Sequence, residues 1–439
     1  MPKPLLRLLR LEDSTAAERR ATVLLAAMFF FSLGSTFLLR PLRDQFGVDQ
    51  GVDRFVYLYS LTLLATVVCV LPFWWLANRM PSLRFIPIVQ HVCAAAFVLL
   101  AFGLASTDYD WSRLPWLGEV FWGGFSAINV VIPTLVWIHA VEHFRREQAR
   151  RLFGLVAVGG TLGAVFGLWF SGWLSGTVKA APWVSGVGAA VLLEGAFVCY
   201  LASLPACRTL SAEADADAGA EPAGSRVAAG GIFAGLRLLV SDGYVRAIGC
   251  YMLMIGMLAT AFYVAQTELV GEQIAQARKQ HTILANMDFW AQSLVLALQL
   301  FCTGRLLRRF PPTALLISLP VFSIFGLGAW WLWPTVAAIF AIQVLRRGAQ
   351  YAFEKPAREL LYTPLDLETK HKAKFLFDTF AFRLGDVFGA VLQAELRRHD
   401  VGLGGIVVVT IVVALVWIAL GFYLGRRRHA AERPAQSSS

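Results

Sequence analysis

The sequence predicts an all-α membrane protein whose twelve transmembrane helices form two pseudo-repeated six-helix bundles. Composition gives the class, because 57% of the 439 residues are hydrophobic, only 15% are charged and the mean hydropathy is +0.60. Runs of about 20 mostly apolar residues, each long enough to cross a bilayer as a helix, give the number of spans. We expect them near 21–40, 55–77, 84–105, 116–140, 152–175, 183–204, 244–266, 285–307, 313–333, 335–354, 375–395 and 403–425.

The domain organisation follows from a polar segment between the sixth and seventh runs. Residues 205–231 are rich in Ala, Gly, Asp and Glu and bury too little apolar surface to fold, so they are predicted to be a flexible cytoplasmic linker. The linker separates an N-terminal six-helix bundle, residues 1–204, from a C-terminal one, residues 232–425. Residues 426–439 are predicted to be a cytoplasmic tail.

A weak internal repeat connects the two halves. Gly163-Ala-Val-Phe-Gly167 in the fifth run recurs as Gly385-Asp-Val-Phe-Gly389 in the eleventh. Glycine at every fourth residue lets two membrane helices approach closely. Two repeated six-helix halves with a central cytoplasmic linker resemble the major facilitator architecture, which implies two bundles that rock around a site near the bilayer midplane.

Orientation follows from the positions of Lys and Arg. They gather at the N-terminus, in the central linker, in the loop with Lys370, Lys372 and Lys374, and at the C-terminus. The positive-inside rule therefore predicts that both termini lie in the cytoplasm. We expect a multi-pass protein of the bacterial inner membrane. The formal net charge of +10 reflects this topology, and without a nucleic-acid-binding motif it does not predict a nucleic-acid partner.

Enzymatic chemistry is not predicted. The six cysteines include no CxxC pair, and we find neither a metal-ligand spacing nor a Ser, Cys or His constellation with a recognisable partner. We expect no metal and no cofactor. The lipid bilayer is an expected partner, and a monomer is compatible with the sequence.

The functional centre is predicted between residues 350 and 398, where the charge density is the highest in the chain although apolar runs flank it. Ionisable groups near membrane depth usually face a bundle interior or a water-filled path. The tenth run carries cationic and aromatic residues at helical spacing, an arrangement suited to a phosphate or carboxylate. The alternative is that these Arg side chains pair with Glu354 or Asp386 and only lock the bundle. Arg346 and Arg347 fall near the middle of this run, and the residues that recur on one face are Arg347, Tyr351, Glu354 or Lys355, and Arg358.

Charged residues also mark the ends of two corresponding helices. The first run ends in Arg40, Arg43 and Asp44, and Arg40 and Asp44 are spaced to pair on a helix. The seventh run ends near Glu268. A basic end and an acidic end at equivalent places suggest an outer gate, and the alternative is interfacial charge facing water. In the fourth run, Glu119 either caps the helix or lines a cavity, and we favour the cavity.

The segment from Arg358 carries a family likeness in the pattern Arg358-Glu359-x-x-Tyr362-x-Pro364-Leu365-Asp366-x-Glu368-x-Lys370-x-Lys372-x-Lys374, followed by Asp378 and Arg383-Leu-Gly385. It resembles the helix 10 to 11 segment of the ATP:ADP antiporter family of plastids and intracellular bacteria. The stretches Arg40 to Asp44 and Glu119 to Gly123 resemble further elements of the family. The resemblance implies nucleotide exchange by alternating access, with phosphate-binding and gating roles for Arg43, Glu119, Glu268 and the basic residues around Lys374.

One position departs from the family. After Arg383-Leu-Gly385 the family pattern implies a Lys, and this chain has Asp386. An acid beside Arg383 could take up a proton, which would turn an exchanger into a symporter. It could instead neutralise the Arg when the site is empty.

The leading hypothesis is therefore a secondary-active transporter of an organic anion, a nucleotide or another phosphorylated metabolite, that works by alternating access. The alternatives are a proton-coupled transporter of a non-nucleotide solute and a non-transporting membrane scaffold or sensor. The substrate-binding candidates are Arg40, Arg43, Glu119, Arg346, Arg347, Tyr351, Lys355, Arg358, Lys374 and Arg383. The gating or coupling candidates are Asp44, Glu268, Glu354, Glu359, Asp378 and Asp386.

Overall fold

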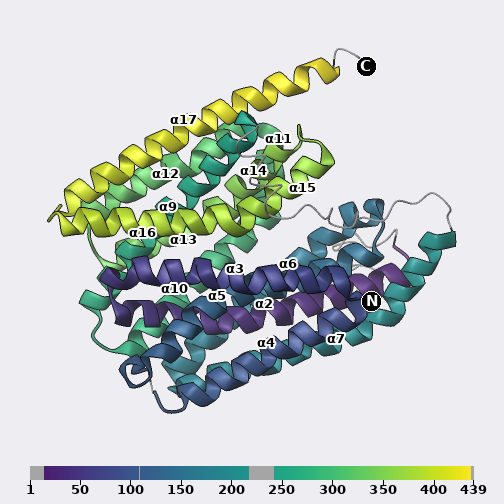
Figure 1. Ribbon diagram of the computed structural model, residues 1–439, viewed down its shortest axis with the longest axis horizontal. Coiled ribbons are helices and arrows are strands. Elements are labelled where there is room, and N and C mark those ends of the chain that lie inside the picture. The colour runs from purple at the N-terminus through teal and green to yellow at the C-terminus, as the bar shows by residue number, and fades with distance from the viewer. Residues whose placement is uncertain (1–13, 108, 217–241, 437–439) are drawn as a thin grey trace. The chain divides into compact units, whose positions relative to one another are not determined.

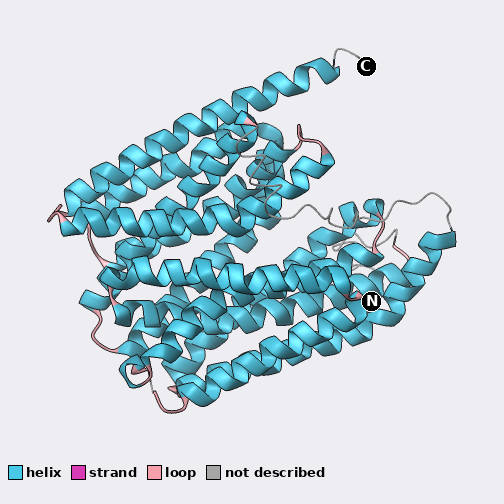
Figure 2. Cartoon of the chain, viewed as in Figure 1, coloured by secondary structure: helices cyan, strands magenta, loops and turns pink. Residues whose placement is uncertain are grey.

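A computed structural model describes residues 14–107, 109–216 and 242–436, and in these ranges every regular element is a helix (Figures 1 and 2). Ten helical spans among the described residues are long and apolar enough to cross a membrane. The helices that contain them are α2 (Ala16–Gln50), α3 (Phe55–Arg79), α4 (Ser82–Leu104), α5 (Pro115–His143), α6 (Arg146–Trp173), α7 (Pro182–Ala216), α9 (Gly243–Gln273), α10 (Ala277–Leu298), α12 (Pro312–Leu332) and α17 (Leu403–Gln436).

The two remaining predicted spans are helical but broken by π-turns. The first consists of α13 (Val336–Ala349), the π-helix η5 (Gln350–Glu354) and α14 (Lys355–Glu359). The second follows α15 (Leu367–Leu376) and consists of the π-helix η7 (Phe377–Ala381) and α16 (Phe382–Arg398). These two segments are rich in charged residues and are not counted among the ten apolar spans. The total of twelve membrane crossings therefore stays a prediction.

The predicted linker is described only in part. Residues 205–216 continue helix α7, while residues 217–231 lie outside the described residues. The described chain divides into two compact units. Unit 1 comprises residues 1–43, 67–227 and 281–289, and unit 2 comprises residues 44–66, 228–280 and 290–439. Unit boundaries fall inside α2, α3 and α10, and the predicted domain boundaries remain predictions.

Close helix packing through glycine organises unit 1. On α6, Gly159 and Gly163 face the α2 backbone so closely that an added Cβ would overlap the carbonyl oxygens of Ala26 and Phe30. A glycine stripe of this kind brings two membrane helices to backbone contact. Helices α4 and α7 pack along one another in the same unit (Figure 1).

Helix α9 is the centre of unit 2, where it packs against α13, α16 and α17. Aromatic residues fill the core around it: Tyr251 and Trp417 are fully buried, with ring centroids 5.6 Å apart. The Tyr251 hydroxyl donates a hydrogen bond to the Leu316 carbonyl on α12 (2.9 Å), which satisfies a polar group in an apolar core.

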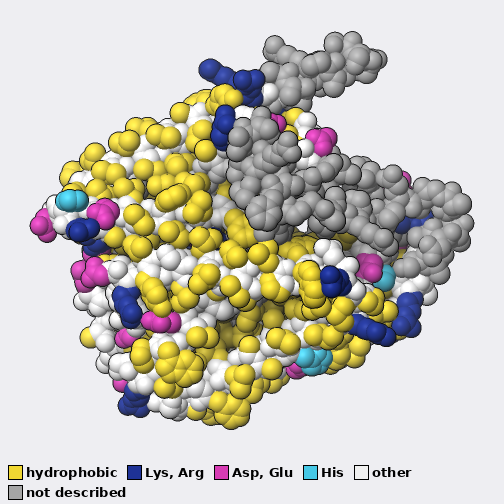
Figure 3. Space-filling view, viewed as in Figure 1, with side chains coloured by type: hydrophobic (Ala, Val, Ile, Leu, Met, Phe, Trp, Pro, Cys, Tyr) yellow, Lys and Arg dark blue, Asp and Glu magenta, His cyan; other side chains and the backbone are white. Residues whose placement is uncertain are grey.

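Outward-facing surfaces are apolar along the spans. Large side chains such as Leu99, Phe102 and Phe325 are at least 70% exposed. In Figure 3 hydrophobic side chains run along the flank of α17 and charged ones lie at helix ends. Such a surface is suited to lipid.

In the loop before α5, the Ser112 hydroxyl donates a hydrogen bond to the exposed Asp110 carboxylate (2.6 Å) and lowers the pKa of that carboxylate.

Candidate functional site

Buried cations lie at the end of α13 in unit 2. Arg346 and Arg347 occupy its last turn and are only 5% and 7% exposed. The chain then forms the π-helix η5 instead of continuing as a regular α-helix. Such π-turns are frequent at functional sites because they redirect side chains without ending the helix. Arg346 and Arg347 are therefore buried within the described protein, whereas Lys355 of the predicted face is exposed.

Arg346 has a distinctive set of partners. Its Nε and Nη2 donate to Gln343 Oε1 at 3.1 and 3.0 Å, and its Nη1 donates to Gln350 Oε1 at 3.4 Å. The guanidinium lies 5.3 Å from the centre of the Phe262 ring. Among the described residues its hydrogen-bond partners are thus neutral amides, with no carboxylate. A buried cation held this way retains unneutralised charge.

One of the two amides that hold Arg346, Gln343, is fixed in turn by α9. Gln343, fully buried, donates through Nε2 to Gln266 Oε1 (2.8 Å) and to the Phe262 carbonyl (3.4 Å). An amide offers both a donor and an acceptor. Because the Nε2 group of Gln343 is directed to α9, its Oε1 atom is presented to the Arg346 guanidinium. Sequence reasoning missed this role of Gln343, Gln266 and Gln350. Their only signal was a recurrence of Gln inside apolar helices.

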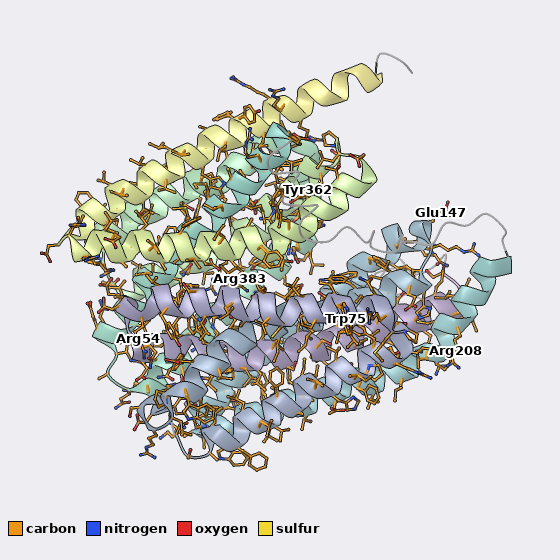
Figure 4. The ribbon with its side chains drawn as sticks, in the orientation of Figure 1. Arg54, Trp75, Glu147, Arg208, Tyr362 and Arg383 are labelled. Atoms are coloured by element: carbon orange, nitrogen blue, oxygen red, sulfur yellow. The ribbon has the colours of Figure 1, made fainter. Side chains whose placement is uncertain are left out.

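Arg358 differs because it has an acidic partner. Its Nη1 lies 3.4 Å from Glu354 Oε1, one helical turn away, and their side chains are 8% and 0% exposed. The alternative that an Arg of this face pairs with Glu354 therefore describes Arg358. Tyr351 on the same turn lies under the Lys355 ammonium, 5.6 Å from ring centre to Nζ. Figure 4 labels Tyr362, which is buried one turn after Arg358.

A second acid and base pair lies on α16. Arg383, labelled in Figure 4, donates through Nη1 to Asp386 Oδ2 (3.3 Å). The other carboxylate oxygen of Asp386 accepts a hydrogen bond from Thr260 on α9 (3.2 Å). Asp386 is buried, so the acid at the position where the family pattern implies Lys neutralises Arg383 in this structure.

The remaining candidates of this region lie nearer the surface. Lys374 on α15 contacts Glu359 at 2.6 Å, and both side chains are about two-fifths exposed (41% and 38%). Asp378 on η7 is exposed. The binding or coupling roles of these groups stay predictions.

The charged helix ends contact partners that the sequence did not indicate. In unit 1, Arg40 Nε lies 2.7 Å from Asp288 Oδ2 on α10. In unit 2, Asp44 accepts a hydrogen bond from Tyr263 on α9 (3.0 Å). The pairing of Arg40 with Asp44 stays a prediction from helical spacing, and each of the two also contacts a side chain on another helix.

Glu268 on α9 forms a two-pronged ion pair. Arg397 near the end of α16 donates two hydrogen bonds to its carboxylate, at 2.6 and 2.8 Å. Arg397 was not among the candidates, because a partner 129 residues away leaves no local signal. The gating role of Glu268 is compatible with this pair but stays a prediction.

Two unit 1 candidates lie on or near α5. The Arg43 guanidinium stacks 4.4 Å from the Trp122 ring centre, and Phe125 lies at 6.0 Å. Glu119, one turn before Trp122, is partly buried. The stretch from Glu119 to Gly123 thus supplies an aromatic face for a cation, a contact stabilised by the ring quadrupole.

Comparison with known proteins gives a consistent result. The family described as TLC ATP/ADP transporter matches residues 280–427, which include α13 to α16. ADP,ATP carrier protein 1 of Chlamydia trachomatis serovar D is 22% identical over 328 residues, covering 66% of this chain and 61% of the carrier. The plastidic ATP/ADP-transporter of Solanum tuberosum is 23% identical over 209 residues, covering 42% and 33%. The chain thus spans about three-fifths of the length of the carrier.

Solved structures share the fold. A mutant of the nucleoside transporter NupG superposes with a TM-score of 0.60 at 14% identity, over 94% of this chain and 99% of that one. A bacterial homolog to the human lysosomal transporter Spinster, inward-facing and unoccupied, gives 0.58 at 13% identity, over 95% and 99%.

Apolar spans, repeated halves and these superpositions define a membrane protein of the major facilitator fold. Within that class, residues 280–427 match the TLC ATP/ADP transporter family, and the chain is similar to ADP,ATP carriers at 22–23% identity. The resemblance predicted from the segment after Arg358 is therefore confirmed.

Proposed function

We propose that the protein is a secondary-active transporter that exchanges nucleotides, or closely related phosphorylated metabolites, by alternating access in a bacterial inner membrane. Both termini lie in the cytoplasm. The observation that carries the proposal is Arg346: a buried guanidinium with neutral amide partners and an aromatic ring beside it. Its unneutralised charge favours an anion, and its planar fork suits the paired oxygens of a phosphate.

The surroundings of Arg346 fit such a ligand. Arg347 is adjacent and buried, so a second positive charge lies on the same turn. The paired cations Arg358 and Arg383 are held by Glu354 and Asp386, and each pair supplies a guanidinium that can exchange its carboxylate for a phosphate. The relatives whose names include ATP/ADP transporter or ADP,ATP carrier support the nucleotide over other anions.

The test is nucleotide exchange in proteoliposomes. Vesicles loaded with ADP or ATP take up labelled ATP, and Arg346→Gln is compared with the native protein. Loss of a charged hydrogen bond costs about 1.5–3 kcal/mol, so we expect uptake at limiting ATP to fall by about tenfold or more. Arg346→Lys keeps the charge without the fork and should retain part of the activity.

The control is Arg113→Gln, which removes a cation from the exposed loop where Arg113 contacts Asp110 at 3.3 Å. It should exchange nucleotides like the native protein. Full exchange by well-inserted Arg346→Gln would contradict the proposal. So would an absence of any nucleotide exchange by the native protein.

A second candidate function, proton-coupled transport of a non-nucleotide solute, rests on the buried Asp386 between Arg383 and Thr260. The same vesicles distinguish it. Exchange that ignores the proton gradient supports the antiporter, whereas solute uptake that needs the gradient and disappears in Asp386→Asn supports the symporter.

A further inference from the structure

Three side chains with metal-binding chemistry meet in unit 1, and none of them is among the charged candidates above. His139 and His143 lie on the last turns of α5, and Cys207 lies on α7. One ligand atom from each falls within 4.8 Å of the other two. His139 and Cys207 are 1% and 0% exposed, and His143 is partly exposed. Figure 4 labels Arg208, the residue after Cys207 on α7.

The spacing suits a borderline divalent ion. Two imidazoles four residues apart share one face of a helix. With Zn–N bonds of about 2.0 Å and Zn–S bonds of about 2.3 Å, tetrahedral ligand atoms lie about 3.3–3.6 Å apart. The Cys207 Sγ already lies 3.8 Å from His139 Nε2. The widest separation in the cluster, at most 4.8 Å, needs about 1 Å of closure, which side-chain rotation supplies.

Polar groups around the cluster orient the buried imidazole. Ser203 Oγ lies 2.8 Å from His139 Nε2 and donates its own proton to the Tyr200 carbonyl at 2.6 Å. Because the hydroxyl proton is committed, Ser203 accepts from the Nε2–H of the imidazole, and metal binding at Nε2 requires the tautomer that carries its proton on Nδ1. The Tyr200 ring packs edge-on against His139 with centroids 4.8 Å apart, and its buried hydroxyl has no hydrogen-bond partner among the described residues.

Local charge also favours a cation. Glu142, exposed and adjacent to His143, interacts electrostatically with His143 and Cys207. A divalent ion bound by one thiolate and two neutral imidazoles keeps one positive charge, which the Glu142 carboxylate offsets. The partly exposed side of His143 supplies the entry path and the open position for a water ligand.

We propose that His139, His143 and Cys207 form a binding site for zinc or a similar transition-metal ion. Imidazole and thiolate ligands select such ions over Mg²⁺ or Ca²⁺, which prefer oxygen. The bound ion links α5 to α7 by coordinate bonds at the point where the chain turns from α5 into α6. The site is independent of the nucleotide proposal, because none of its residues belongs to the candidate transport site.

Cobalt titration tests the site directly. Co²⁺ added to the full-length, detergent-purified protein, free of any histidine tag, should give a thiolate-to-cobalt charge-transfer band that saturates near one equivalent and is displaced by Zn²⁺. Cys207→Ser should abolish the band, because only a bound thiolate produces it. The control Cys93→Ser removes another buried cysteine, on α4, and should leave the band intact.

His143→Gln alters the most exposed ligand and is the variant least prone to misfolding; it should weaken Co²⁺ affinity at least tenfold. The proposal is overturned if no charge-transfer band forms, if binding needs a large excess of metal, or if the band survives Cys207→Ser. Nucleotide exchange does not enter any of these readouts, so failure here leaves the proposed transport function untouched.

Discussion

Two short segments, residues 161–167 on α6 in unit 1 and residues 383–389 on α16 in unit 2, have nearly the same sequence and different neighbours. They read Thr-Leu-Gly-Ala-Val-Phe-Gly and Arg-Leu-Gly-Asp-Val-Phe-Gly. The shared residues include both glycines, and the differences are confined to the first and fourth positions. Each segment can therefore serve as the reference for the other.

The glycines perform the same task in both units. A Cβ on Gly163 would overlap the carbonyl oxygen of Phe30 on α2, and a Cβ on Gly385 would overlap the carbonyl oxygen of Leu253 on α9. Corresponding helices thus reach backbone contact at corresponding residues. The internal repeat read from the sequence is a repeat of helix packing, as expected for small residues at a membrane helix interface.

The two differing positions carry charge in one unit only. In unit 1 the Thr161 hydroxyl bonds back to the Ala157 carbonyl (3.2 Å) and Ala164 is buried. In unit 2 the equivalents Arg383 and Asp386 form a pair held by Thr260. The scaffold does not require these charges, since the other copy packs without them. This is the strongest reason to connect Arg383 and Asp386 with function.

Substituting the shared glycines should have the largest effect. Gly163→Ala and Gly385→Ala each place a methyl group on a backbone carbonyl, which cannot move aside as a flexible side chain would. Overpacking of this kind costs about 1–3 kcal/mol or more. We expect a clear fall in the midpoint of thermal denaturation of the detergent-purified protein for both variants.

Each glycine has a matched control. Gly154 on α6 and Gly328 on α12 have nothing within 4 Å of an added Cβ. Gly154→Ala and Gly328→Ala should leave the denaturation midpoint unchanged or raise it, because Ala is the better helix former. Equal losses in the controls and in Gly163→Ala or Gly385→Ala would contradict the close approach.

Converting the second segment into the first should have a smaller effect. Asp386→Ala alone leaves the Arg383 guanidinium, one-fifth exposed (20%), without its acidic partner, at a cost of about 1–3 kcal/mol in unfolding free energy. Adding Arg383→Thr recreates the unit 1 sequence. The double variant should recover the denaturation midpoint, because removing both members of an ion pair is often neutral.

A transport assay should separate the contribution of the Arg383–Asp386 pair to stability from its contribution to nucleotide exchange. If the pair serves the substrate, the double variant is stable yet exchanges nucleotides poorly in proteoliposomes. A double variant with native exchange would make the pair a packing device, and a double variant as unstable as Asp386→Ala would show that the two scaffolds are not equivalent.

The sequence predicted these helices well because span length, glycine spacing and charge sign are local properties. The spans that stay most apolar were found, and the family likeness after Arg358 was confirmed. The sequence could not predict which partners the charged side chains contact in the folded protein. Arg346 and Arg358 lie on either side of the π-turn η5, and one contacts amides whereas the other contacts an acid. The amide that holds Arg346 is fixed by residues of α9, which the local sequence does not show.

The outer ends of the same two helices give the smallest of the three effects. Arg397 on α16 corresponds to Ser175 after α6: Arg397 holds Glu268 by two hydrogen bonds, whereas the Ser175 hydroxyl contacts Thr282 at 3.0 Å. Arg397 and Glu268 are each about one-quarter exposed (24% and 25%), so water weakens their attraction. A double-mutant cycle with Arg397→Gln and Glu268→Gln should give a coupling of about 1 kcal/mol.

Ser175→Ala removes the contact to Thr282 together with the hydroxyl's hydrogen bonds to the Ser171 and Gly172 carbonyls, all of them neutral, and should cost about 0.5–1.5 kcal/mol. Both values come from denaturation midpoints measured at the same salt concentration, and raising the salt should reduce the coupling of the charged pair while leaving Ser175→Ala unaffected. A coupling near zero at low salt would mean that Arg397 and Glu268 contribute nothing to stability. The excess charge of unit 2 would then be explained by function at both ends of α16.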